Sequence, residues 1–315
     1  NAQRRVAGVA RARFNVAAEF SSPPATAVTW LKALRVHQWL KNLLVLVPLA
    51  GAFQFDEPQL ALQAVIAFFA FSFCASSVYV LNDLADLDSD RAHPRKRLRP
   101  FASGLLSPVS GLLMAGLLLG ASAGLVAGAR PALQATLAGY FALTLAYTFF
   151  LKRKVIIDCV ALGGLYTLRV VAGWCAVGLA ASFWLMAFSL FLFLSLAFVK
   201  RYSELQAAAK LGRADAAGRG YLASDLPLVQ TMGVAAGFGS ALLLALYING
   251  DTVMRHYSHT EVLWLLVPIH LYWISRMWMQ AHRGHMHDDP VVFAVRDPVS
   301  LVSGALFALT LAFAR

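Results

Sequence analysis

The chain has 315 residues, 59% of them hydrophobic and only 14% charged, with a mean hydropathy of +0.64 and a formal charge of +11. Soluble domains typically carry about 25% charged and about 45–50% apolar residues, so this composition excludes an ordinary soluble enzyme and a disordered chain. It indicates a polytopic membrane protein. The three cysteines, Cys74, Cys159 and Cys175, form neither a disulfide framework nor a zinc-binding spacing.

Nine apolar stretches follow a basic segment at 1–30, which we expect to be an arm or linker ahead of a transmembrane domain at 31–315. A membrane-spanning helix needs about 20 mostly apolar residues. The stretches lie at 39–55, 60–80, 110–126, 132–151, 155–179, 182–199, 227–248, 262–278 and 299–313, of which the first and last are short. The sequence therefore predicts an all-α bundle of about nine transmembrane helices.

The Lys and Arg residues are divided unevenly between the connections. One side, with the N-terminal arm and the loops near 83–99, 152–154, 200–220 and 276–296, holds 23 of the 27, and the other side holds three. Because cytoplasmic loops carry the excess of Lys and Arg, we expect an integral inner- or plasma-membrane protein with cytoplasmic N-terminus and polar loops. Much of the positive charge then reflects topology alone.

Four aspartates follow the second apolar stretch within eight residues. If the helix continues through them, Asp83, Asp86 and Asp90 fall within an arc of about 60°, which Asn82 extends, while Asp88 points elsewhere. Aligned carboxylates repel one another unless a cation is bound, and Mg²⁺ is usually held by one or two carboxylates together with water and substrate phosphates. We predict a Mg²⁺ site on Asp83, Asp86 and Asp90; a solvated acidic helix end is the alternative.

A basic run at 93–100 follows the aspartates directly, and it includes Lys96 and Arg99. These cations are suited to phosphate oxygens that a metal leaves uncovered, although a run of this kind is also a topology signal. Three more polar residues mark the start of the first apolar stretch, where they either contact phosphate or extend to the membrane interface. They are Arg35, Lys41 and Asn42.

The spacing from Asn82 to Asp90, followed by the basic run and Gly104, resembles the first aspartate motif of the UbiA superfamily of intramembrane prenyltransferases. The stretches 35–42, 151–173 and 200–205 resemble its decaprenyl-phosphate phosphoribosyltransferase branch. This resemblance implies a UbiA-like helical bundle, Mg²⁺ on the first motif and an active site open to the cytoplasm and to lipid. It also implies transfer of phosphoribose from phosphoribosyl diphosphate (PRPP) to a polyprenyl phosphate, a step in lipid-linked sugar synthesis.

The loop after the sixth stretch departs from the aromatic prenyltransferases of this superfamily, which carry a second aspartate-rich motif there. It begins instead with Lys200, Arg201, Tyr202, Ser203 and Glu204, and three further cations follow before residue 220. We expect Lys200, Arg201, Tyr202 and Glu204 to bind substrate. Two phosphorylated substrates require this extra positive charge, whereas a benzoate acceptor does not.

Two charged residues lie inside the fifth stretch. Asp158 and Arg169 are eleven residues apart, which returns to within about 20° of the same helix face. Charges at such depth usually face the bundle interior, so we expect both to bind substrate, with pairing between helices as the alternative. Lys152 lies just ahead of them and is a further candidate for phosphate binding.

The last polar loop holds a cluster of His282, His285, His287, Asp288 and Asp289. Solvated histidines are more common than a transition-metal site with this composition. A role beside the substrate is a second interpretation for Asp288 or Asp289, because functional loops often carry such residues.

The leading hypothesis is Mg²⁺-dependent phosphoribosyl transfer, with basic residues among Lys152, Lys200 and Arg201 on the 5-phosphate. The attacking phosphate oxygen is already anionic, so no strong general base is needed. An aromatic prenyltransferase with a polyprenyl diphosphate donor is the first alternative, and an ion-coupled transporter is the second. We expect membrane lipids and no nucleic acid as partners; a homo-oligomer, and a phosphatase-like domain upstream of Asn1 or as a separate partner, stay open.

Overall fold

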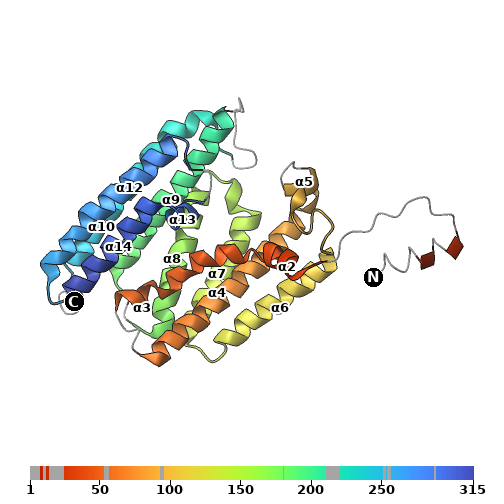
Figure 1. Cartoon of the computed structure of the whole chain (residues 1–315), viewed down its shortest axis with the longest axis horizontal. Helices are drawn as coiled ribbons and strands as arrows, with labels where there is room; N and C mark the ends of the chain where they lie inside the picture. Colours follow the sequence, from red (N-terminus) through yellow and green to blue (C-terminus); the bar gives the residue numbers. More distant parts are fainter. Residues whose placement is uncertain are drawn as a thin grey trace.

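The computed structural model describes residues 8–9, 12–13, 25–52, 57–92, 96–179, 181–210, 220–250, 253, 257–286 and 289–315. Helices are the regular secondary structure of these residues, so the predicted all-α class is confirmed. Long helices lie side by side in an elongated bundle (Figure 1). Most of the predicted arm at 1–30, and His287 and Asp288 of the last polar loop, lie outside the described residues.

The helices follow one another with short connections, and α4, α6, α7, α13 and α14 each begin at a proline. Proline is favoured in a first helical turn because its missing N–H has no intrahelical acceptor there. In chain order the elements are α2 (Ala27–Ala33), η1 (Val36–Leu46), α3 (Val47–Gly51), α4 (Pro58–Ala85), α5 (Leu87–Ala92), η2 (Lys96–Leu98), α6 (Pro108–Val126), α7 (Pro131–Phe149), η3 (Leu151–Arg153), α8 (Ile157–Val177), α9 (Phe183–Lys210), η4 (Ala223–Asp225), α10 (Leu226–Ile248), η5 (Thr260–Leu265), α12 (Leu266–His282), α13 (Pro290–Ala294) and α14 (Pro298–Ala314).

Six of the described helices are long and apolar enough to cross a membrane: α4, α6, α8, α9, η4 with α10, and η5 with α12. The fourth predicted span is the 19-residue α7, and the last is the shorter apolar α14. The first predicted span, 39–55, differs most, because it is the 3-10 helix η1 followed by α3. Pro48 cannot donate the hydrogen bond that would join the two into one α-helix.

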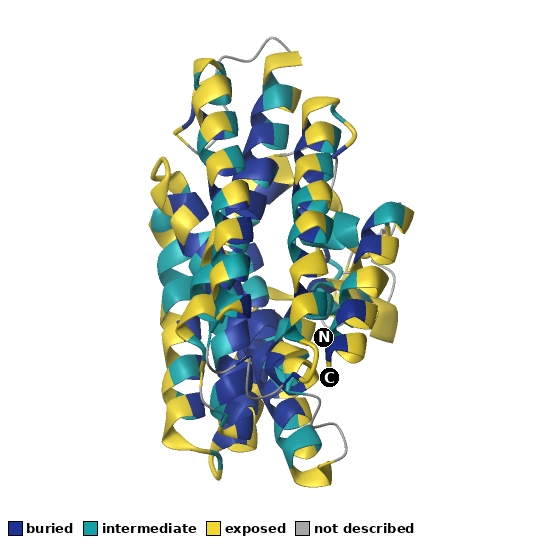
Figure 2. Cartoon of the chain, turned by 90° about the vertical axis from the view of Figure 1, so that its left-hand side faces the viewer, coloured by how far each residue is buried: buried dark blue, intermediate teal, exposed yellow. Residues whose placement is uncertain are grey.

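The helix α8 lies at the centre of the packing. One of its faces contributes Tyr166, Val170 and Trp174 to a core shared with α9 and α12, and the other packs against α4 and α7. Figure 2 shows buried residues along the inner faces of the helices and exposed residues on the outer faces. Exposed side chains such as Leu113 and Phe313 are apolar, as a lipid-facing surface requires.

Candidate active site

A cavity of about 770 Å³ lies where η1 and the helices α4, α7, α8, α9 and α13 meet. Its described lining contains two carboxylates, Asp86 and Asp289, together with the amide of Asn82. Eight basic side chains surround them, which makes the cavity strongly cationic: Arg35, Lys41, Lys96, Arg99, Lys152, Arg153, Arg169 and Lys200. Nine of the sequence-predicted site residues therefore converge here: Arg35, Lys41, Asn82, Asp86, Lys96, Arg99, Lys152, Arg169 and Lys200.

The aspartate motif does not form one continuous helix. The helix α4 ends at Ala85, Asp86 caps it with φ −92° and ψ 10°, and α5 begins at Leu87. The cap bond from the Asp86 N–H to the Asn82 carbonyl oxygen, 2.9 Å long, keeps both residues on the cavity wall. The predicted continuous stripe of carboxylates is therefore interrupted at its middle residue.

Asp83 and Asp90 are held by arginines instead of facing the cavity. The Arg99 Nη1 lies 3.1 Å from Asp83 Oδ1 and 2.6 Å from Asp90 Oδ2, and Arg35 Nη2 lies 2.6 Å from Asp83 Oδ1. Both carboxylates are almost fully buried. A guanidinium thus joins two of the three carboxylates that the sequence assigned to a metal, and the described residues contain no group of three metal-ligating side chains.

The residues at this wall nevertheless fit a Mg²⁺ ion. Magnesium needs only one or two protein carboxylates, with water and phosphate oxygens completing its shell. Asp86 keeps about a third of its side chain exposed and lies 3.6 Å from Lys152 Nζ, and the Asn82 amide lines the cavity beside it. Asp90, which does not line the cavity, also has one buried oxygen, Oδ1, without a hydrogen bond, 4.0 Å from Lys96 Nζ.

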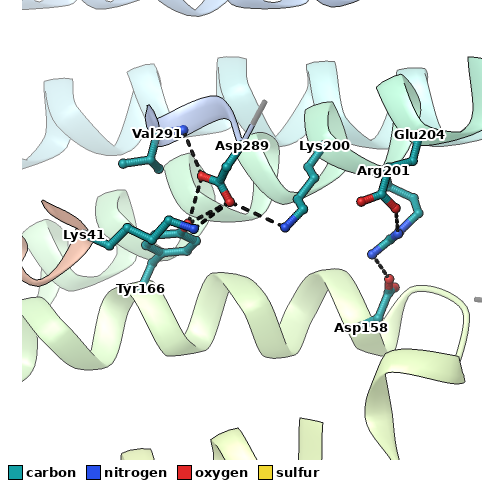
Figure 3. Close-up of polar contacts among 8 residues, drawn as sticks. All are labelled: Lys41, Asp158, Tyr166, Lys200, Arg201, Glu204, Asp289 and Val291. Atoms are coloured by element: carbon teal, nitrogen blue, oxygen red, sulfur yellow. Dashed lines mark hydrogen bonds and ion pairs between the residues drawn. The ribbon is translucent and has the colours of Figure 1, made fainter. Parts of the chain in front are cut away.

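A second charged cluster, the Asp289 cluster, is formed by Lys41, Tyr166, Lys200 and Asp289 (Figure 3). Asp289 Oδ2 lies 2.7 Å from Lys41 Nζ and 3.4 Å from Lys200 Nζ, while Asp289 Oδ1 accepts hydrogen bonds from the Tyr166 hydroxyl and the Val291 N–H. Burial opposes ionisation of Asp289, but the two ammonium groups outweigh it and hold the pKa of this carboxyl well below its usual value. Of the two aspartates singled out in the last loop, Asp289 is at the cavity.

Arg169 contributes a buried positive charge to the cavity wall. Its Nε donates to Asn42 Oδ1 at 2.8 Å, and its two Nη atoms donate to the Leu165 carbonyl and the Tyr140 hydroxyl. Asn42 itself is buried and donates to Ser72, so it orients Arg169 and does not line the cavity. Since these acceptors are neutral, the guanidinium charge is available to an anion.

Besides Asn42, four predicted substrate-binding residues lie away from the cavity wall: Asp158, Arg201, Tyr202 and Glu204. Arg201 Nη2 lies 2.6 Å from Asp158 Oδ2, and Arg201 also pairs with Glu204. Successive residues of a helix point about 100° apart, so Lys200 faces Asp289 while Arg201 faces the start of α8 (Figure 3). The rotation of α9 could not be predicted from its own residues, and the structure places all four residues away from the cavity although substrate binding was expected of them.

The tyrosine-rich wall of α7 was missed in the sequence. Tyr140, Thr144, Tyr147 and Thr148 all line the cavity. Their spacing of four, three and one places them on one face of a helix that is otherwise mostly apolar. A polar stripe of this kind was a readable signal for a site wall.

Comparison with known proteins decides the family. Residues 43–214 match the profile of the UbiA prenyltransferase family. The chain belongs to the UbiA prenyltransferase family. It is 38% identical to nodulation protein NoeC of Azorhizobium caulinodans, over 91% of this chain and 93% of that protein. It is 40% identical to the uncharacterized protein y4nM of Sinorhizobium fredii over 89% of this chain, and spans only 54% of that protein's length.

Two further comparisons bear on the branch and the fold of this UbiA-family chain. Decaprenyl-phosphate phosphoribosyltransferase of Mycolicibacterium smegmatis is 36% identical over 69% of this chain and 70% of that protein. A solved UbiA homologue from Archaeoglobus fulgidus, bound to DMAPP and Mg²⁺, superposes with a TM-score of 0.67 at 19% identity, over 91% of this chain and 98% of that one. The predicted UbiA-like bundle is thus confirmed, and with six long apolar helices among its described residues the chain is a multi-pass membrane protein of a transferase family.

Proposed function

We propose that this protein transfers 5-phosphoribose from PRPP to a polyprenyl phosphate, with Mg²⁺ and with release of diphosphate. The observation that carries the proposal is the excess of eight basic side chains over two carboxylates around one cavity. PRPP brings a diphosphate and a 5-phosphate, and the acceptor brings a third phosphate group. Binding all of these phosphate groups in one cavity requires closely spaced Lys and Arg donors. The similarity to decaprenyl-phosphate phosphoribosyltransferases supports the same substrates.

The wall with the aspartate motif is suited to the diphosphate of the donor. Asp86 and Asn82 would hold Mg²⁺, which when bound neutralises the charge that develops on a leaving diphosphate. Lys152 and Arg153 lie at the same cavity and can donate to the remaining diphosphate oxygens. Asp83 and Asp90 hold Arg35 and Arg99 at this wall, and they could become metal ligands only if these arginines gave up their ion pairs.

The transfer needs one bond to form and one to break. An oxygen of the polyprenyl phosphate attacks the anomeric carbon, and the bond from that carbon to the diphosphate oxygen breaks, so that diphosphate leaves with the bonding pair. The attacking oxygen is anionic at neutral pH, and no side chain has to remove a proton. Arg169 and the lysines of the Asp289 cluster stabilise the phosphates while they approach each other, and Leu162, Leu165 and Leu196 give the cavity apolar surface for a prenyl chain.

Aromatic prenyl transfer is the second candidate, because the fold is shared with a UbiA homologue that binds DMAPP. It would use the same Mg²⁺-assisted loss of diphosphate, from an allylic carbon in place of an anomeric one. A second acidic motif after the sixth predicted span, in the segment 200–220, would support it. Among the described residues of that segment the acidic residue is Glu204, and Arg201 already pairs with it.

One pair of assays separates the two candidates. The detergent-purified protein is incubated with Mg²⁺, labelled PRPP and a polyprenyl phosphate, and in parallel with a prenyl diphosphate and hydroxybenzoate. We expect label to enter the lipid phase in the first mixture, and to stay in water when Mg²⁺ is replaced by EDTA. Prenylated hydroxybenzoate together with an unlabelled lipid phase would refute the proposal in favour of the second candidate.

A further inference from the structure

The Asp289 cluster resembles an anion-binding site that already has an occupant. Two ammonium groups and one hydroxyl converge on the carboxylate, from three different elements: Lys41 on η1, Tyr166 on α8 and Lys200 on α9. Lys, Lys and Tyr are also the donors that suit a phosphate group. The carboxylate therefore stands where an anionic substrate group would find the same partners.

Asp289 reaches this position from the connection between α12 and the five-residue α13. The donors are carried by η1, α8 and α9, with Tyr166 in the hydrophobic core, whereas the carboxylate is attached to the start of the short helix α13 (Figure 3). Asp289 and Lys41 keep about a tenth of their side chains exposed, and Lys200 about a third, all at the cavity. A ligand in the cavity can thus reach the donors without unpacking the core.

The difference in charge favours replacement of the Asp289 carboxylate by a phosphate group. A carboxylate carries one negative charge, and a phosphate monoester carries between one and two at neutral pH with three acceptor oxygens. The doubly charged group attracts two ammonium ions more strongly at the same distance. Three arginines of the cavity have partners other than Asp289. Arg35 and Arg99 pair with aspartates of the motif, and Arg169 donates to neutral acceptors.

We propose that Lys41, Lys200 and Tyr166 form a phosphate-monoester subsite, and that Asp289 is an internal occupant which the substrate phosphate displaces. The proposal rests on the proposed function for the identity of the phosphate, which is either the 5-phosphate of the donor or the head group of the lipid acceptor. In the absence of substrate the carboxylate keeps the two lysines from repelling each other. Substrate binding then frees Asp289 and the start of α13 from the cavity wall.

Binding of two phosphate monoesters to purified protein tests the subsite without turnover. Ribose 5-phosphate is the soluble arm and farnesyl phosphate in detergent is the lipid arm, both titrated calorimetrically in EDTA. Asp289→Asn keeps an oxygen that caps α13 and removes the competing charge. We expect it to bind at least one of the two ligands about tenfold more tightly than the unchanged protein, equivalent to about 1.4 kcal/mol. The ligand whose affinity increases identifies the source of the phosphate.

Matched variants make the result specific to the subsite. Asp297→Asn is the control, because Asp297 also caps a helix and pairs with an arginine but does not line the cavity. Its affinities should equal those of the unchanged protein. Adding Lys41→Met to Asp289→Asn should abolish the gain. Asp289→Ser, which also keeps a capping oxygen, replaces Asp289→Asn if the latter does not fold.

Equal or weaker binding of both ligands by folded Asp289→Asn or Asp289→Ser would overturn the subsite and leave Asp289 as a structural link. Failure of phosphoribosyl transfer is a separate result. If the protein lacks phosphoribosyl transfer activity, Asp289→Asn can still bind a phosphate monoester more tightly. If the protein has that activity, Asp289→Asn can still leave the affinity unchanged. The subsite and the proposed function are therefore tested independently.

Discussion

Asp86 and Asp88 are two residues apart and lie in opposite surroundings. Asp86 is on the cavity wall, 3.6 Å from Lys152 Nζ, whereas the side chain of Asp88 is fully exposed and 3.7 Å from Arg91 Nη1. Residues two positions apart on a helical segment point about 200° apart, so the two carboxylates face opposite sides, and the break between α4 and α5 does not change this. The two residues therefore form a natural pair for testing which carboxylates take part in the chemistry.

Asp86→Asn should lower kcat/KM for phosphoribosyl transfer by about 100-fold or more, which is typical for loss of a group that stabilises charge in the transition state. Asp88→Asn removes the same charge from the same acidic segment and should stay within about twofold of the unchanged protein. Initial rates at saturating Mg²⁺ measure both. Equal losses in the two variants would mean that the net charge of the segment matters and that Asp86 has no specific role.

At the scale of single residues, the sequence predicted the types of side chain at the site better than their directions. Arg35, Lys41, Asn82 and Asp86 were singled out and all line the cavity. Arg201 was grouped with Lys200, but the two side chains point to different sides of α9. Which side of α9 faces the cavity depends on its packing against other helices, so it could not be predicted from the residues of α9 alone. Asp289 pairs with a lysine 248 positions away in the chain, a contact that only the folded bundle specifies.

At the scale of elements, a close approach between α8 and η1 fixes the wall that carries Lys41. Gly173 on α8 leaves no room for a side chain, because a Cβ there would collide with the Val45 carbonyl oxygen and lie 2.8 Å from Pro48 Cδ. Gly164, on the same helix, is different, since a Cβ there would meet only Leu143 Cδ2 at 3.8 Å. The backbone of η1 can approach α8 in this way only where the residue on α8 is glycine.

Gly173→Ala should therefore lower the thermal unfolding midpoint and weaken substrate binding together, because η1 has to move away from α8 and takes Lys41 with it. The cost of such overpacking is about 1–3 kcal/mol. Gly164→Ala should be neutral or slightly stabilising, since alanine is the better helix former and meets only ordinary contacts. Unfolding followed by tryptophan fluorescence in detergent measures both. A Gly173→Ala protein as stable as Gly164→Ala would contradict the close approach.

The helices α12 and α14 are joined by an ion pair whose contribution should depend on pH. Arg276 Nη2 donates to Asp297 Oδ1 at 2.9 Å, and Asp297 also caps α14 by accepting from the Ser300 N–H. Burial raises the pKa of Asp297, but its hydrogen bonds from Arg276 and Ser300 outweigh burial and lower the pKa below the ordinary 3.8. A lowered carboxyl pKa stabilises the fold above the unfolded-state value, and this stabilisation is lost as the pH falls through the folded-state value.

Asp297→Asn should thus cost about 2 kcal/mol at pH 7, the usual contribution of hydrogen bonds to a charged group, since asparagine retains the helix cap but not the charge. The difference from the unchanged protein should persist down to about pH 4.5 and shrink below pH 4 as Asp297 is protonated. Unfolding midpoints at several pH values check this. A stability difference that grows as the pH falls would show that folding does not lower the pKa of Asp297.

At the scale of the whole molecule, basic residues gather at one end of the bundle. The cavity there is walled by the end of α4, the connection before α8, the part of α9 that carries Lys200, and the start of α13. A cationic cavity at this end attracts anionic substrates from the adjoining solution. Apolar runs and charge asymmetry predicted this arrangement from sequence, because they reflect the membrane itself. The short η1 and the break at Asp86 depend on local backbone bonds and were not predicted.

The orientation of the bundle in the membrane is the last prediction. The spanning segment from Thr260 to His282 separates Glu261 from the cavity end, where Asp289 and the α4–α5 break lie. Glu261 and Asp88 are both exposed, so each can carry a reactive thiol. Because Lys and Arg concentrate at the cavity end, that end should face the cytoplasm.

Cysteines introduced one at a time and labelled with a membrane-impermeant maleimide test this orientation in intact cells. Native Cys74 and Cys159 are buried and should react little, and Cys175→Ala removes the third thiol. We expect Glu261→Cys to be labelled in intact cells, and Asp88→Cys only after the membrane is permeabilised. The opposite pattern would place the cavity outside the cytoplasm, where PRPP is not made, and would contradict both the orientation and the proposed donor.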